Sequence, residues 1–94
     1  MRFKISSAAS QEIKSAVEFY SNQGQDLALA FLDDFDKVCR LISDYPEIGS
    51  QIEYGNRKVV FQSYPHSVIY RVEGELIYVL AVGHQRRKPG YWNK

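Results

Sequence analysis

The side chains with the clearest chemical potential gather at the end of the sequence, in "VLAVGHQRRKPGYWNK". Up to Gly83 this stretch is apolar and reads as a strand, and from His84 onward it is basic and aromatic with no acidic residue. A histidine can act as a general base near neutral pH, and preorganised cations stabilise the charge of a reacting phosphate. Arg and Trp are also the residues most enriched at protein-interface hot spots. The segment therefore fits either phosphate chemistry or the binding of a macromolecular partner.

The charges divide between the two halves of the sequence. Residues 1–54 carry five Lys or Arg and nine Asp or Glu, whereas residues 55–94 carry seven and two, giving −4 and +5. A second basic pair, Arg57 and Lys58, opens a β-rich segment in the positive half. Segregation of this kind indicates a C-terminal half that faces an anionic partner, with a chance imbalance between two solvated faces as the alternative.

Other site chemistries are not indicated. His66, His84 and Cys39 do not have the spacing of metal ligands, and there is no glycine-rich phosphate loop or nucleophile elbow. We therefore expect neither a metal nor a cofactor. The single cysteine lies in an apolar helical pattern and predicts a reduced thiol, and no apolar run is long enough to span a membrane. These features favour a cytoplasmic protein without a membrane segment.

The elements that position these residues follow from hydrophobic spacing. Residues 2–6 form a short strand pattern, and residues 6–24 form a helix capped by Ser6 or Ser7. A longer helix follows "NQGQ", with Asp26 as its cap and Tyr45-Pro46 as its end. Its apolar seam is spaced 4, 3, 4, 3 and consists of Phe31, Phe35, Val38, Ile42 and Tyr45.

Three strand patterns follow, over residues 57–63, 67–72 and 75–83. The "EGE" link between the last two predicts a tight hairpin. The order β-α-α-β-β-β predicts an α+β domain in which a helical hairpin packs on a small twisted antiparallel sheet. We expect one domain over residues 1–94, with residues 84–94 as a basic, aromatic C-terminal tail.

The order of elements resembles the RelE/ParE superfamily of type II toxin–antitoxin toxins, also called plasmid stabilization proteins. The matching stretches are "DYPEIGSQ", "RKVVFQSYPHSVIYRV" and "VLAVGHQRRKPGYW". The resemblance implies a growth-inhibiting toxin that a small antitoxin, encoded by the neighbouring gene, neutralises in a hetero-oligomer. It covers the whole chain and establishes the fold more firmly than the activity.

The superfamily divides into at least two mechanisms. RelE-like members are metal-independent, ribosome-dependent endoribonucleases that cleave mRNA, and ParE-like members inhibit DNA gyrase. Placed on the ribonuclease pattern, Lys58 matches the first lysine of the second strand and Tyr91 the C-terminal tyrosine. Val60, Ser67 and Gln85 occupy three positions where the ribonucleases carry cations. Because each such donor is typically worth about 10²–10³-fold in rate, we expect a ParE-like inhibitor rather than an enzyme.

Three alternatives stay open: a RelE-like ribonuclease, an inactive toxin homologue and, ranked last, a plain nucleic-acid-binding module. The candidate catalytic residues of a ribonuclease are Lys58, His84, Arg86, Arg87 and Tyr91. The residues we expect to bind the target are Arg57, Lys58, His84, Arg86, Arg87, Lys88, Tyr91 and Trp92. His84 could instead serve only as a strand-end residue, and Tyr91 and Trp92 could fold back onto the domain.

Overall fold

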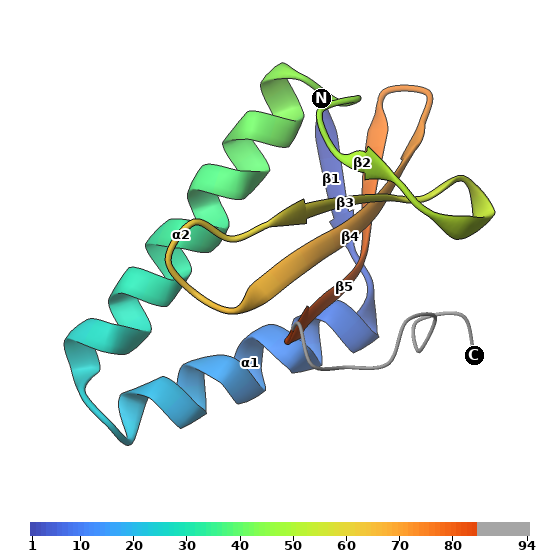
Figure 1. The fold of residues 1–94 in the computed structure, drawn as a ribbon. Helices are drawn as coiled ribbons and strands as arrows, with labels where there is room; N and C mark the ends of the chain where they lie inside the picture. Colours follow the sequence, from blue (N-terminus) through green and yellow to red (C-terminus); the bar gives the residue numbers. More distant parts are fainter. Residues whose placement is uncertain (85–94) are drawn as a thin grey trace.

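The computed structural model describes residues 1–84, in which two helices pack against one sheet (Figure 1). The elements are β1 (Arg2–Ile5), α1 (Ser7–Ser21), α2 (Gln25–Asp44), β2 (Ser50–Gln51), the 3₁₀ turn η1 (Glu53–Gly55), β3 (Arg57–Val60), β4 (His66–Glu73) and β5 (Leu76–His84). This is the predicted α+β order, with the short strand β2 added between α2 and β3, where no strand was predicted. None of the helices in this part of the chain is long and apolar enough to cross a membrane.

The sheet has five strands in the order β1-β5-β4-β3-β2. Strands β2 to β5 are antiparallel neighbours, as predicted for the last three strand patterns. The sheet as a whole is mixed, because β1 pairs with β5 in parallel, with Ile5 opposite Val79. β1 and β5 lie at opposite ends of the described sequence, and β1 occupies the edge of β5 that β4 leaves open (Figure 1).

The helix boundaries follow the sequence with one correction. Ser6 caps α1 as predicted, since its Oγ accepts the amide hydrogen of Ala9 at 3.0 Å. Asp26 does not cap α2, because the helix already begins at Gln25 and Gly24 is the N-cap residue. Asp26 instead lies in the first turn, where its negative charge favours the helix dipole. The end of α2 at Asp44 agrees with the Tyr45-Pro46 signal.

The core lies between the helices and one face of the sheet. Most of the predicted seam of α2 is there: Phe31, Val38 and Ile42 are buried and pack with Val68, Tyr70, Ile77, Val79 and Val82 of the sheet. Tyr45 is the exception, at 62% exposed, because it follows the last helical residue with an extended φ of −136° and leaves the seam. These contacts fix the helix-facing side of each strand.

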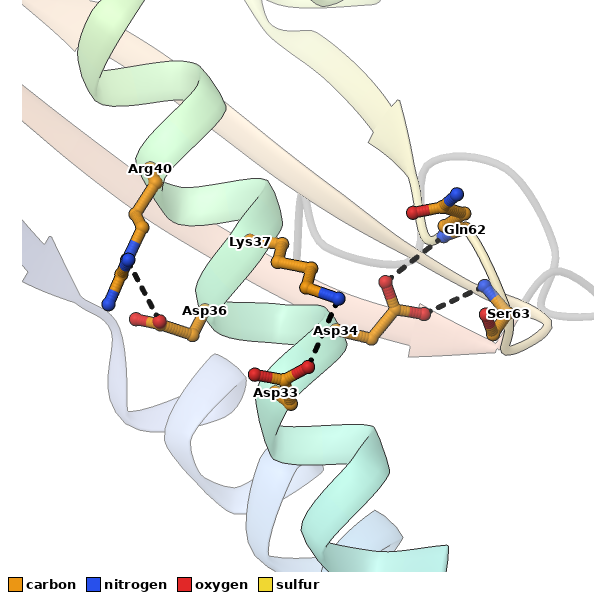
Figure 2. A network of polar contacts seen from close by, with 7 residues as sticks. All are labelled: Asp33, Asp34, Asp36, Lys37, Arg40, Gln62 and Ser63. Carbon is orange, nitrogen blue, oxygen red and sulfur yellow. Dashed lines mark hydrogen bonds and ion pairs between the residues drawn. The ribbon is translucent and has the colours of Figure 1, made fainter.

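A buried carboxylate ties α2 to the loop that follows β3. Asp34 is 6% exposed, and its two oxygens accept the amide hydrogens of Gln62 and Ser63 at 3.3 and 2.8 Å (Figure 2). The neighbouring Asp33 and Asp36 only form exposed ion pairs with Lys37 and Arg40. Asp34 thus satisfies two backbone donors that the β3–β4 connection leaves without strand partners.

Candidate target-binding site

A β-bulge in the middle of β5 determines on which face of the sheet His84 lies. Tyr70 pairs with Val79 but Ile69 pairs with Ala81, so Leu80 is an extra residue in β5. Ile77 and Val79 face the core, and strict alternation would place Ala81 and Gly83 on that face next. The extra residue shifts the pattern, and Val82 packs in the core instead. His84 therefore lies on the helix-facing side of the sheet.

His84 meets a second histidine there. His66 is its direct partner on β4, and the two ring centroids are 5.3 Å apart. His66 itself is buried among aromatic rings, with centroids 5.0 Å from Phe31 and 5.7 Å from Phe61. Burial first, and the nearby charge of His84 second, lower the pKa of His66 to about 4. His66 is therefore an uncharged imidazole at neutral pH, and its Nδ1 has no hydrogen-bond partner among the described residues.

A pocket of about 410 Å³ opens between α1 and this end of the sheet. Its lining residues are Gln11, Glu12, Ser15, Ala16, Phe19, Tyr20, His66, Val82 and His84. At this pocket the side chain of Glu12 on α1 contacts β5, because its Oε1 accepts the amide hydrogen of Val82 at 2.9 Å. The pocket combines an apolar floor with two imidazoles and one carboxylate.

The opposite face of the sheet carries the other candidate residues. Lys58 and Val60 alternate with Val59, which packs on the core, so both side chains lie on the face away from the helices. Lys58 is exposed and pairs with Ile69, and Val60 pairs with Ser67. Ser67 in turn pairs with Gly83 on β5. A row without charge, Val60–Ser67–Gly83, therefore crosses the three strands.

Arg57 uses its guanidinium inside the domain. Its Nη1 donates to the carbonyl oxygens of Glu47 at 3.0 Å and Gly49 at 2.9 Å. Tyr70 is the partner of Arg57 on the neighbouring strand β4. The hydroxyl of Tyr70 donates to Pro46 O at 2.7 Å and accepts from Gly49 N at 3.1 Å. Arg57 and Tyr70 together hold the loop between α2 and β2, which is a structural role that its place in a basic pair did not reveal.

The structure thus divides the predicted site residues between two places. Lys58 lies on the outer face and His84 on the helix-facing side, so the sheet separates these two side chains. Arg86, Arg87, Lys88, Tyr91 and Trp92 lie outside the described residues. Sequence reasoning missed His66 and Glu12, because a hairpin without a bulge would pair His66 with Gly83 and because no spacing signal links Glu12 to Val82.

The described residues offer no metal centre: within residues 1–84, no group of three or more His, Cys, Asp or Glu side chains is placed to hold an ion. The titratable side chains at this end of the sheet are the His66 and His84 imidazoles and the Glu12 carboxylate, and Lys58 is exposed on the opposite face. This set is suited to contacts with a macromolecule.

Comparisons with known proteins agree with this geometry. Residues 3–89 match the family model described as the ParE toxin of the type II toxin–antitoxin system parDE. A solved structure entitled "Chromosomal ParDE TA system from P. aeruginosa" is similar, with a TM-score of 0.76 and 21% identity. The match covers 89% of this chain and 95% of that one, and at this identity it shows the fold. A search of curated proteins gives no match.

Proposed function

Because the chain belongs to the ParE toxin family of type II toxin–antitoxin systems, we propose that it inhibits growth by binding DNA gyrase and does not cleave RNA. Membership of this family confirms the resemblance drawn from the sequence. The gyrase target, the residues that contact it and a cytoplasmic location are parts of the proposal.

The observation that carries the proposal is the uncharged row Val60–Ser67–Gly83 on the outer face of the sheet. Cleavage of RNA by its own 2′-hydroxyl needs a base, an acid and cations that stabilise the charge on phosphorus. Lys58 is the one cation on the outer face of β3, and the sheet separates it from His84. A single phosphate in contact with Lys58 could not also receive or lose a proton at His84. Inhibition by binding requires neither a proton-transfer pair nor a cluster of cations around one phosphate.

Target contacts are proposed for His84 and Lys58 within the described residues. The basic and aromatic residues that follow, Arg86, Arg87, Lys88, Tyr91 and Trp92, complete the proposed surface. Residues of these types carry much of the binding energy at interfaces, and positive charge also speeds encounter with an acidic partner. Arg57 is retained in the proposal with a supporting role, because its guanidinium already binds two backbone carbonyls.

Membership of the family implies a cognate antitoxin, and we propose that it docks on the helical hairpin. Several large apolar side chains of the two helices are exposed: Phe19, Leu27, Leu29, Leu32 and Leu41. An amphipathic segment of the antitoxin could cover them, and a hetero-oligomer would follow. This surface is distinct from the outer face that bears Lys58.

The decisive experiment induces the protein without its antitoxin and follows DNA supercoiling and mRNA integrity together. We expect purified protein to block supercoiling by gyrase and to leave ribosome-bound mRNA intact. Codon-positioned mRNA cleavage that disappears on changing His84 or Tyr91 would instead establish the ribonuclease. Harmless expression with neither effect would identify an inactive homologue.

A matched pair of lysine variants tests the outer face. Lys58→Ala should weaken gyrase inhibition by about 10-fold or more, the effect of losing one hot-spot contact. Lys37→Ala should leave inhibition unchanged, because Lys37 lies in an exposed ion pair on α2. Equal inhibition by both variants would remove Lys58 from the target surface.

A further inference from the structure

The last part of β5 extends past its neighbour β1. β1 ends at Ile5, opposite Val79, whereas β5 continues to His84. Backbone groups on this edge from Leu80 onward therefore have no β1 strand to bond with. An unpaired edge frays unless other groups satisfy it.

Two side chains take the place of the missing strand: Ser6, the N-cap residue of α1, and Glu12 within that helix. The hydroxyl of Ser6 donates to Leu80 O at 3.0 Å, and Glu12 Oε1 accepts from Val82 N at 2.9 Å. Leu80 is the extra residue of the bulge, and Val82 is the first residue that the bulge turns toward the helices. Both bonds act where the direction of the strand is set.

Glu12 is the more informative of the two. Ser6 also caps α1, so changing it would disturb the helix as well. Glu12 lies in the middle of α1, lines the same pocket as His66 and His84, and reaches a residue 70 positions away in the sequence. Its bond holds the residue two places before His84.

We propose that Glu12 is a positioning residue for target binding, which fixes the backbone of β5 beyond the bulge and so the placement of His84 at the end of the strand. This inference rests on the proposed gyrase inhibition. A carboxylate that only stabilised the fold would affect folding and antitoxin binding together with inhibition. A positioning residue affects inhibition while the helical hairpin, where the antitoxin is proposed to dock, keeps its shape.

Four variants distinguish the hydrogen bond from charge and from general stability. Glu12→Gln keeps an acceptor of the same length without the charge, and Glu12→Asp keeps the charge but is one methylene shorter. Glu12→Leu removes the acceptor. Glu18→Leu is the control, because Glu18 is exposed on the same helix.

Three measurements are made on each full-length protein: exchange of the Val82 amide hydrogen by NMR, inhibition of gyrase supercoiling, and affinity for the antitoxin. In Glu12→Leu and Glu12→Asp we expect the exchange rate of the Val82 amide to rise, because this amide loses its hydrogen-bond acceptor. We expect inhibition of gyrase by these two variants to fall by about 10-fold or more. Glu12→Gln and Glu18→Leu should stay within about 3-fold of the wild type, and all variants should bind antitoxin with similar affinity.

Several outcomes would overturn the inference. If Glu12→Asp inhibits gyrase as strongly as the wild type, the hydrogen-bond acceptor does not position the strand. The same conclusion follows if Glu12→Gln inhibits gyrase as weakly as Glu12→Asp. Equal losses of antitoxin affinity and inhibition would reduce Glu12 to a stabilising residue. If the wild type does not block gyrase, the proposed function fails. In that case the variants are compared by Val82 exchange and by growth inhibition. If Glu12→Leu and Glu12→Asp are again the impaired variants in both measurements, the positioning role of Glu12 is supported. If Val82 exchange is unchanged in Glu12→Asp, that role is contradicted.

Discussion

His66 connects the aromatic core to the candidate site. Its ring is close to the core rings of Phe31 and Phe61 and also to the ring of His84. A protonated imidazole would have to leave water to occupy this position, which is why burial dominates the lowering of its pKa. The pair gives the end of β5 a sensitivity to acid that a phenylalanine at the same position would lack.

The free energy of unfolding should therefore fall in mild acid. The pKa of His66 is about 4 in the folded protein and ordinarily 6.5, so the unfolded chain takes up the proton first. The stabilisation is present above pH 6.5 and is lost as the pH falls toward 4. Between pH 7 and pH 5 we expect a loss of about 2 kcal/mol by urea denaturation. His66→Phe, which retains an aromatic ring, should show a smaller loss, and identical slopes for the two proteins would contradict this account.

Tyr70 should contribute strongly through its hydroxyl. That group joins Pro46 O and Gly49 N, and Tyr70 is fully buried. Tyr70→Phe leaves both backbone groups unpaired and should lower the free energy of unfolding by about 1–3 kcal/mol. Tyr45→Phe is the control, because Tyr45 is 62% exposed, and it should change little. Equal effects of the two changes in denaturant titrations would remove the role assigned to this hydroxyl.

Gly49 should tolerate no side chain at this point of contact. A Cβ atom at Gly49 would lie 2.8 Å from Tyr70 Oη and 3.0 Å from Arg57 Cβ. Gly49→Ala should therefore destabilise the protein by about 1–3 kcal/mol. Combined with Tyr70→Phe, the loss should be smaller than the sum, since both changes break the same contact. Strict additivity in the double variant would contradict the shared cause.

At the scale of elements, Asp34 connects α2 with the loop after β3. Asp34→Ala leaves two backbone amides without their acceptor and should cost about 2–3 kcal/mol in thermal or urea unfolding. Asp33→Ala and Asp36→Ala should each cost less than about 0.5 kcal/mol, because each removes only an exposed ion pair. Figure 2 shows these three carboxylates on the same stretch of helix, which makes the comparison a direct one. A loss for Asp33→Ala as large as that for Asp34→Ala would show that helix propensity, not the loop contact, is measured.

The order of the two helices and four main strands could be predicted because each of these elements has a local signal in the sequence. Ser6 predicts the start of α1 as its N-cap residue, and Tyr45-Pro46 predicts the end of α2. The spacing of Phe31, Val38 and Ile42 identifies the buried side of α2. The parallel pairing of β1 with β5 depends on contacts between residues more than 70 positions apart, for which no local pattern exists.

The bulge is the element-scale feature that matters most for the site. Alternation along residues 76–84 predicts His84 on the outer face of the sheet, and one extra residue at Leu80 places it on the helix-facing side. The same holds for Arg57: its charge is evident in the sequence, but its two carbonyl acceptors come from a loop folded against it. Residue type was predictable, whereas the face and the partner of each side chain were set by the tertiary structure.

At the scale of the whole molecule, we propose that the domain carries two separate binding surfaces. The helical hairpin exposes apolar side chains, where we propose that the antitoxin docks, and the sheet carries Lys58 on its outer face and His84 at the end of β5. Separate surfaces would allow one protein to be held by the antitoxin and to act on a different target. The charge division, −4 for residues 1–54 and +5 for residues 55–94, follows the same partition along the sequence.

Truncation after His84 tests whether the scaffold and the proposed target surface are separable. The core residues of the described part end at Val82, so we expect the shortened protein to fold, with a melting temperature within about 5 °C of the full chain. It should bind the antitoxin with similar affinity and lose gyrase inhibition by about 100-fold, as expected when several hot-spot residues are removed together. The full-length variant Trp92→Ala should show a smaller loss of inhibition with the same stability. If the truncated protein folds and still stops growth, the surface that acts on the target lies within residues 1–84, and Lys58, His84 and the pocket beside Glu12 become its first candidates. If it unfolds, the residues after His84 belong to the core, and Trp92→Ala should then lower the melting temperature and antitoxin affinity together.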